Sequence, residues 1–70
     1  MANPKKSLGE AIKSRRLKLG LTQEQLAEAA DLHWTFVSGV ERGVRNISID
    51  NLYRISVALK LRMRDLVKDV

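Results

Sequence analysis

Hydrophobic residues recur every three or four positions along most of the chain, which is typical of amphipathic helices. The first stripe consists of Leu8, Ile12 and Leu19, and Arg16 falls on the same stripe. This spacing predicts a helix over residues 8–19. A charged side chain on an otherwise apolar stripe needs a partner when it is buried.

Polar residues mark both ends of this first helix. Ser7 and Glu10 have the spacing of a capping box, and Gly20 suits the position just after the last turn. We therefore expect residues 1–6 to form a flexible N-terminal arm and residues 7–70 to form a single domain.

A second helix is predicted over residues 23–30. Thr22 and Gln25 form another capping box at its start. Its inward positions are small or apolar, which allows a neighbouring helix to approach closely. These positions are Leu26, Ala27 and Ala30.

A short turn at residues 31–33 leads to a third helix, predicted over residues 34–42 and ended by Gly43. Val37 and Val40 point inward on this helix. Its opposite face carries Trp34, Thr35, Ser38 and Arg42.

Two more helices complete the pattern. Ser48 is a good N-cap for the fourth helix. This helix has a core stripe and a second apolar stripe, formed by Leu52, Ile55 and Leu59 and by Ile49, Tyr53 and Val57 respectively. A fifth, short helix over residues 63–68 carries Leu66 and Val67. No hairpin signal is present, so we predict an all-α fold of five helices.

Composition and charge indicate the kind of partner that the domain binds. The 70 residues suit one domain and carry a net charge of +5. The first 18 residues hold six basic side chains against one acidic side chain. Such patchy charge suits a surface that meets a polyanion, although a generic basic domain is the alternative. No apolar stretch has the length of a membrane span or of a signal-peptide core, so we expect a cytoplasmic protein without a membrane partner.

The segment LTQEQLAEAADLHWTFVSGVERG resembles the helix-turn-helix of the lambda-repressor-like, Cro-type (XRE) family. The stretch VERGVRNISIDNL is most similar to the controller proteins of restriction-modification systems, which are small dimers. The resemblance implies a compact five-helix domain that binds a pseudo-palindromic operator in double-stranded DNA as a homodimer and regulates transcription. RNA polymerase is a further candidate partner.

The resemblance places the exposed face of the third helix in the major groove, where base edges are read. We expect base contacts from Trp34, Thr35, Ser38 and Gly39. Thr35 offers both a hydroxyl and a methyl group. Controller proteins often have Arg where this chain has Trp34, so Trp34 either packs on a thymine methyl or sugar, or folds back onto the protein. Gly39 costs helix stability, and close approach to DNA or to a neighbouring helix would offset this cost.

Phosphate contacts are expected around the same helix. The candidate residues are Thr22, Gln23, His33, Arg42, Arg45 and Asn46. Arg45 is also suited to a narrow minor groove. Phe36 replaces the Tyr that is common in the family, so we interpret it as a packing residue. The alternative role is helix capping for Thr22 and Gln23, and a solvated side chain for Arg42, Arg45 and Asn46.

Two further groups of residues have expected roles that need no nucleic acid. The resemblance implies a partly buried salt bridge between Arg16 and Glu41; two independent surface charges are the alternative. The second apolar stripe predicts a dimer interface, formed by Ile49, Tyr53, Val57, Leu61 and Met63. Alternatively, the fifth helix covers this stripe within one chain.

Other function classes have weaker support in the sequence. A protein-binding module of the same fold, such as an antitoxin or anti-repressor, would use the apolar stripe for a different chain. An enzyme is not expected, because clustered carboxylates and multiple histidines are absent from the sequence. His33 is the only histidine and there is no cysteine, so no metal or other cofactor is predicted.

Overall fold

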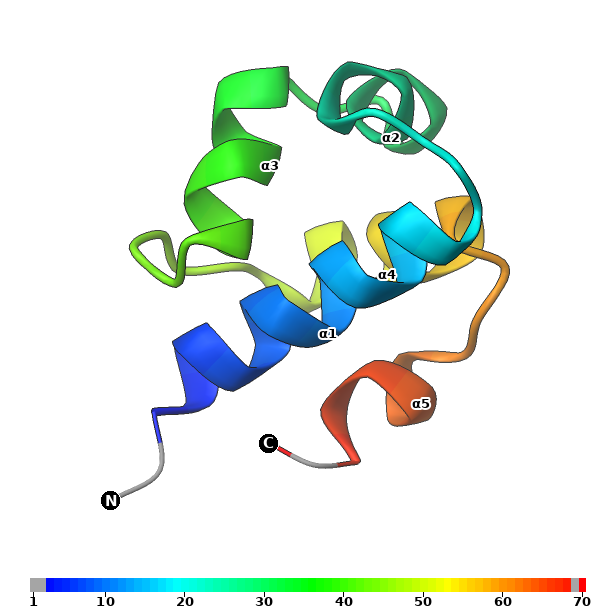
Figure 1. The fold of residues 1–70 in the computed structure, drawn as a ribbon. Coiled ribbons are helices and arrows are strands. Elements are labelled where there is room, and N and C mark those ends of the chain that lie inside the picture. The colour runs from blue at the N-terminus through cyan, green and yellow to red at the C-terminus, as the bar shows by residue number, and fades with distance from the viewer. Residues whose placement is uncertain (1–2, 69) are drawn as a thin grey trace.

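The computed structural model describes residues 3–68 and 70, and these fold into five α-helices without a strand (Figure 1). The helices are α1 (Pro4–Lys18), α2 (Gln23–Ala30), α3 (Trp34–Glu41), α4 (Ile49–Ala58) and α5 (Met63–Val67). The predicted all-α class is therefore confirmed. The bounds of α2 are as predicted, whereas α1, α3 and α5 each end one residue before the predicted position.

The predicted start of the first helix is wrong. The Asn3 side chain accepts a hydrogen bond from the Lys6 amide at 3.2 Å, and Pro4 occupies the first turn, where its missing N–H costs nothing. Ser7 therefore lies inside α1 and does not cap it. Residues 4–6 of the predicted arm are helical, whereas residues 1 and 2 lie outside the described part of the chain.

The caps predicted for two other helices are confirmed. At the start of α2, the Gln25 amide donates to Thr22 Oγ1 at 3.0 Å and the Thr22 amide donates to Gln25 Oε1 at 2.9 Å. At the start of α4, the Asn51 amide donates to the Ser48 hydroxyl at 3.1 Å. These bonds satisfy amides that have no partner within the helix.

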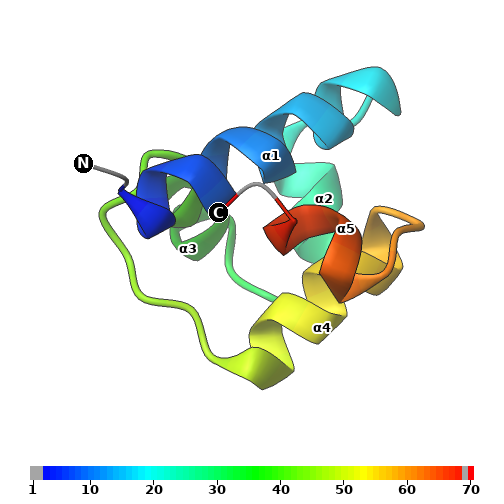
Figure 2. The ribbon, with the colours of Figure 1, turned by 90° about the horizontal axis from the view of Figure 1, so that it is seen from below.

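The core draws side chains from every helix. Its buried apolar members are Leu8, Ile12, Leu26, Ala27, Ala30, Val37, Val40, Leu52, Ile55, Leu59 and Leu66. Helix α1 packs against α3 and α5, while α2 packs against α3 and α4. Helix α5 lies between α1 and α4 and closes the end of the core away from α2 and α3 (Figure 2). Leu19 is only half-buried at the edge of this core, and Val67 is exposed.

A glycine that the hydrophobic pattern missed sets the distance between α1 and α3. A Cβ atom on Gly9 would lie 2.6 Å from the carbonyl oxygen of Glu41, closer than real Cβ atoms come. The missing side chain thus lets the backbone of α1 approach the last turn of α3. Within residues 3–68 no helix has both the length and the apolar character needed to cross a membrane.

Candidate nucleic-acid interface

Helix α3 lies at the edge of the molecule, next to α2, with one face buried and one face free (Figure 1). Val37 and Val40 are buried against the core, as predicted. Thr35 and Arg42 are exposed, Ser38 is half-buried, and Trp34 is 48% exposed. The helix is thus held from behind and presents polar and aromatic groups outward, which is the arrangement that groove reading requires.

A buried ion pair fixes the C-terminal end of α3 to α1. Arg16 Nε donates to Glu41 Oε2 at 2.6 Å, and Arg16 Nη2 donates to Glu41 Oε1 at 3.0 Å. The two side chains are only 9% and 2% exposed. The predicted salt bridge is confirmed, and the alternative of two independent surface charges is wrong.

The hydrogen bonds of this pair extend to the start of the helix-turn-helix. Arg16 Nη1 donates to the Leu21 carbonyl at 2.8 Å, and Gln23 Nε2 donates to Glu41 Oε1 at 3.0 Å. The sequence pattern predicted a phosphate contact for Gln23 and missed this second role. One amide hydrogen of Gln23 therefore helps to position α2 against α3, while its phosphate contact stays a prediction.

His33 and Thr35 form a small hydrogen-bonded unit at the first turn of α3. His33 Nδ1 lies 3.2 Å from the Thr35 amide nitrogen and 2.8 Å from Thr35 Oγ1. The Trp34 ring stacks on the His33 ring, with 6.4 Å between centroids. Trp34 also lines a hollow of about 490 Å³ beside the α1–α2 turn, together with Leu17 and Gly20. Trp34 thus packs in part on the protein and remains half exposed, while its contact with a thymine methyl or sugar stays a prediction.

Arg45 occupies the space in front of Gly39. A Cβ atom on Gly39 would overlap the Arg45 side chain, and the Arg45 guanidinium lies 5.3 Å from the centre of the Phe36 ring. This distance is within the range of a cation–π contact. The side chain of the following loop, rather than a neighbouring helix, therefore fills the gap at Gly39. The predicted base contact of Gly39 stays a prediction and requires Arg45 to move.

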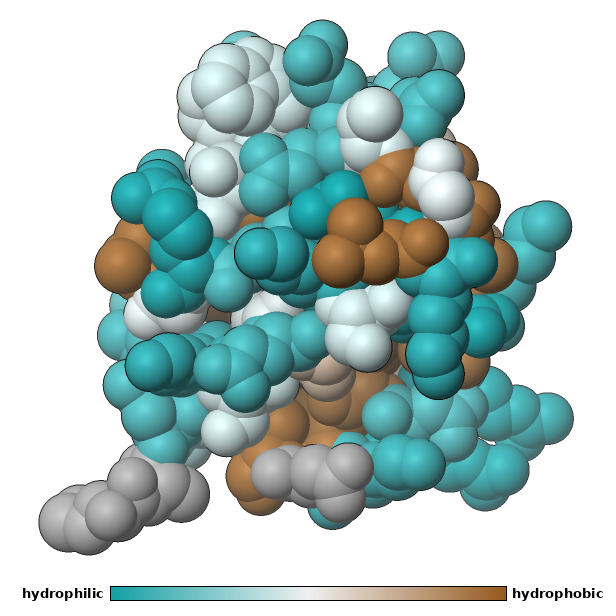
Figure 3. All heavy atoms as spheres, viewed as in Figure 1, coloured by the Kyte–Doolittle hydropathy of each residue, from teal (hydrophilic) through white to brown (hydrophobic). Residues whose placement is uncertain are grey.

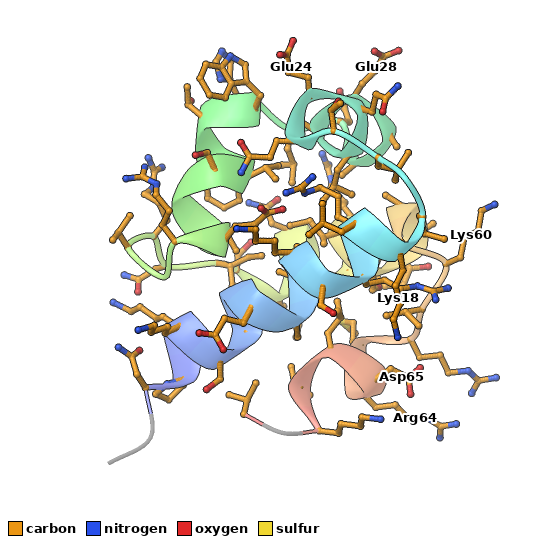
Figure 4. The ribbon with its side chains drawn as sticks, in the orientation of Figure 1. Lys18, Glu24, Glu28, Lys60, Arg64 and Asp65 are labelled. Atoms are coloured by element: carbon orange, nitrogen blue, oxygen red, sulfur yellow. The ribbon has the colours of Figure 1, made fainter. Side chains whose placement is uncertain are left out.

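Charge is unevenly distributed around α3. Arg42 and Asn46 are exposed, as their predicted phosphate contacts require. Glu24 and Glu28 point outward from α2, away from the rest of the molecule (Figure 4). A polyanion is therefore expected to approach α3 and the loop after it, rather than the outer side of α2.

The predicted dimer stripe on α4 is exposed. Ile49, Tyr53 and Val57 are 67%, 58% and 56% exposed, so α5 does not cover them. Leu61 and Met63 are half-buried and pack against the core. By contrast, the face in the view of Figure 1 is mostly hydrophilic, with apolar atoms in separate patches (Figure 3). Scattered apolar patches are common on monomers, whereas an aligned stripe suggests a partner.

The sequence matches the family model described as helix-turn-helix over residues 12–66. It is 45% identical over 60 residues to the control protein C.BamHI from Bacillus amyloliquefaciens, covering 84% of this chain and 74% of that protein. It is 40% identical over 58 residues to the control protein C.MunI from a Mycoplasma species, covering 83% of this chain and 78% of that protein.

Solved structures agree with this assignment. The restriction-modification controller protein C.AhdI from Aeromonas hydrophila superposes with a TM-score of 0.87 at 37% identity, covering 89% of this chain and 94% of that one. The clp gene regulator ClgR from Corynebacterium glutamicum superposes with a TM-score of 0.90 at 29% identity, covering 97% of this chain and 88% of that one. The likeness spans all five helices rather than the central pair alone.

Proposed function

Because this chain belongs to the helix-turn-helix family, and within it to the restriction-modification controller proteins, we propose that it is a DNA-binding transcription regulator. Its role would be control of a restriction-modification system. It would act on double-stranded DNA in the cytoplasm as a regulator rather than an enzyme.

The observation that carries this proposal is how α3 is attached to the rest of the domain. The ion pair of Arg16 and Glu41 fixes one end of the helix, while Thr35 and Trp34 remain exposed at the other. A helix that reads bases must keep its orientation while its outer side chains enter the groove. Buried, directional hydrogen bonds provide that orientation.

The stripe of Ile49, Tyr53 and Val57 supports a homodimer as the active form. A two-fold interface through α4 would bury the same side chains from both copies. The two α3 helices would then meet half-sites about one helical turn apart, roughly 34–36 Å along the DNA. RNA polymerase is proposed as a further partner, because a transcription regulator changes transcription by that enzyme.

Selection from random duplex DNA with the purified protein tests this proposal. Sequencing of the bound pool should reveal inverted half-sites whose centres lie about 10 base pairs apart. The matched control is Thr35→Val, which keeps the shape of the side chain but lacks its hydroxyl, and which should lose enrichment at one position of each half-site. A pool without enrichment would contradict specific DNA binding.

The same preparation distinguishes the protein-binding module that remains as the alternative. Sedimentation of the free protein should give a dimer at micromolar concentration. A monomer that also enriches no DNA sequence would favour a different chain as the occupant of the α4 stripe.

A further inference from the structure

We propose that His33 sets the direction of the hydrogen bond that Thr35 can make with a base. Thr35 would present a hydrogen-bond acceptor and a methyl group to the major groove, but no donor. This inference rests on the proposed DNA binding and adds a chemical class of base edge, the exocyclic amino group of adenine or cytosine. His33 is a positioning residue in this scheme.

The cap hydrogen bond at the start of α3 points to one tautomer of His33. The Thr35 backbone amide lies 3.2 Å from His33 Nδ1, and an amide N–H can only donate. Nδ1 must therefore carry a lone pair rather than a hydrogen. This corresponds to the tautomer with its hydrogen on Nε2.

The same tautomer determines whether the Thr35 hydroxyl donates or accepts. Thr35 Oγ1 lies 2.8 Å from Nδ1. In the tautomer with the ring hydrogen on Nε2, Nδ1 has no hydrogen to donate, so the hydroxyl donates to it and shares its one lone pair with the Thr35 amide. A free threonine hydroxyl rotates to match either a donor or an acceptor. Thr35 cannot donate elsewhere without breaking its contact with His33, and its oxygen keeps lone pairs for an incoming group.

The major groove contains only two kinds of strong donor. These are the N6 amino group of adenine and the N4 amino group of cytosine, whereas guanine O6 and N7 and thymine O4 are acceptors. An exposed oxygen that only accepts is complementary to the two amino groups. The Nε2–H of His33, which is also exposed, is complementary to a phosphate oxygen. His33 and Thr35 thus offer one donor, Nε2–H, to the DNA backbone and one acceptor, Oγ1, to a base.

The test uses an operator obtained by the selection described above. Comparison of wild type with Thr35→Val on operators that carry single base-pair changes identifies the pair that Thr35 contacts. At that pair, adenine is replaced by purine, which lacks the 6-amino group, or cytosine by 2-pyrimidinone, which lacks the 4-amino group. The matched control replaces the purine of the pair with its 7-deaza form, which lacks the N7 acceptor.

Removal of the amino group should weaken binding of the wild type roughly five- to tenfold, and should not further weaken binding of Thr35→Val. Removal of N7 should change neither affinity. The inference is overturned when the loss of affinity follows removal of N7, or when removal of the amino group weakens both proteins equally.

A second pair of variants isolates His33. His33→Gly keeps a residue that is acceptable as an N-cap but removes Nδ1, so the Thr35 hydroxyl is free to donate. His33→Asn keeps an acceptor oxygen at the cap. A freed hydroxyl can either donate or accept, so we expect His33→Gly to show a smaller difference between the amino-deleted and the 7-deaza operators, and His33→Asn to keep the full difference. A His33→Gly protein that retains the full difference contradicts the role of His33.

These outcomes are separate from failure of the proposed function. A protein that selects no operator refutes specific DNA binding itself. A protein that selects an operator but fails the functional-group test refutes only the direction of the Thr35 hydrogen bond.

Discussion

Helices α3 and α4 each bury one face, yet they differ in the face they leave exposed. Val37 of α3 and Ile55 of α4 are both fully buried. Outside, α3 presents Thr35 and Arg42, whereas α4 presents an apolar stripe that includes Tyr53. One buried stripe is enough to place a helix on the core, so the exposed face is free to match a partner. Hydrogen-bonding and cationic groups match a nucleic acid, and aligned apolar groups match a protein surface.

The buried sides differ as well. Helix α3 is attached through a charged residue, Glu41, whose carboxylate accepts hydrogen bonds from Arg16 and Gln23. The buried polar side chain of α4, Ser56, bonds only to the Tyr53 carbonyl of its own helix, at 2.7 Å. Directional bonds between helices restrict rotation of α3 about its axis, whereas apolar packing restricts α4 less specifically.

The largest effect is expected from Glu41→Ala, which removes the directional attachment of α3. It leaves the Arg16 guanidinium buried without a carboxylate, so the free energy of unfolding should fall by about 3–5 kcal/mol. Urea denaturation followed by circular dichroism measures this change. Glu24→Ala, at an exposed acidic residue of α2, is the control and should stay within about 0.5 kcal/mol of wild type.

A double replacement, Arg16→Met with Glu41→Leu, sharpens this test. Because no charge remains buried, it should be more stable than Glu41→Ala. A double variant that is less stable than the single variant would contradict the explanation by an unpaired charge.

The next effect concerns the exposed stripe of α4. Val57→Lys should leave the monomer fold intact, because Val57 is 56% exposed, and should weaken the proposed dimer. The two-fold interface loses one buried valine from each copy, about 1.5–3 kcal/mol per chain, so the dimer Kd should rise by roughly two orders of magnitude or more. Analytical ultracentrifugation measures this shift. Val44→Lys, at a loop residue that is 61% exposed, is the matched control, and equal loss in both variants would refute the α4 interface.

A smaller effect is expected on the exposed face of α3. Arg42→Ala removes one proposed phosphate contact from each protomer and should lower the salt dependence of DNA binding by about 0.9 per protomer in the slope of log K against log salt. At 0.1 M salt this corresponds to about eightfold weaker binding per protomer. Fluorescence anisotropy at several salt concentrations measures the slope. An unchanged slope would mean that Arg42 does not meet a phosphate, and Lys68→Ala on the C-terminal side of α5 serves as the control.

The smallest effect concerns how the two helices end. Helix α3 is followed by Gly43 with φ +76°, whereas α4 is followed by Lys60 with φ +58°. Left-handed backbone is strained for a residue with a Cβ atom, so Lys60→Gly should raise stability by no more than about 1 kcal/mol. Gly43→Ala should lower it, because its Cβ atom would lie 2.9 Å from Lys6 Cα. Thermal denaturation of both variants checks the opposite signs.

Local signals in the sequence predicted most of the fold. The capping box of Thr22 and Gln25 is complete within one turn, so it needs no tertiary information. The start of α1 was predicted wrongly because two capping signals lie close together, Asn3 with Pro4 and Ser7 with Glu10. The helix begins at the earlier signal, so Ser7 lies inside it. The position of Arg16 on an apolar stripe predicted only that it needs a partner, and the family resemblance supplied Glu41 as that partner.

The remaining features depend on contacts between segments distant in the sequence. Gly9 packs on the end of α3, and periodicity within α1 carries no signal for that approach. The contact between Arg45 and Phe36 depends on the path of the loop after α3. The exposed stripe of α4 was predicted from spacing, but only the structure shows that α5 leaves it uncovered.

The position of Trp34 makes the protein its own optical probe. It is the only tryptophan in the chain, it is half exposed on the face proposed to meet DNA, and its ring stacks on His33. Its emission should therefore report DNA binding without an attached dye. The single tyrosine, Tyr53, lies on the exposed stripe of α4, so selective excitation of the indole reports DNA binding without emission from that stripe.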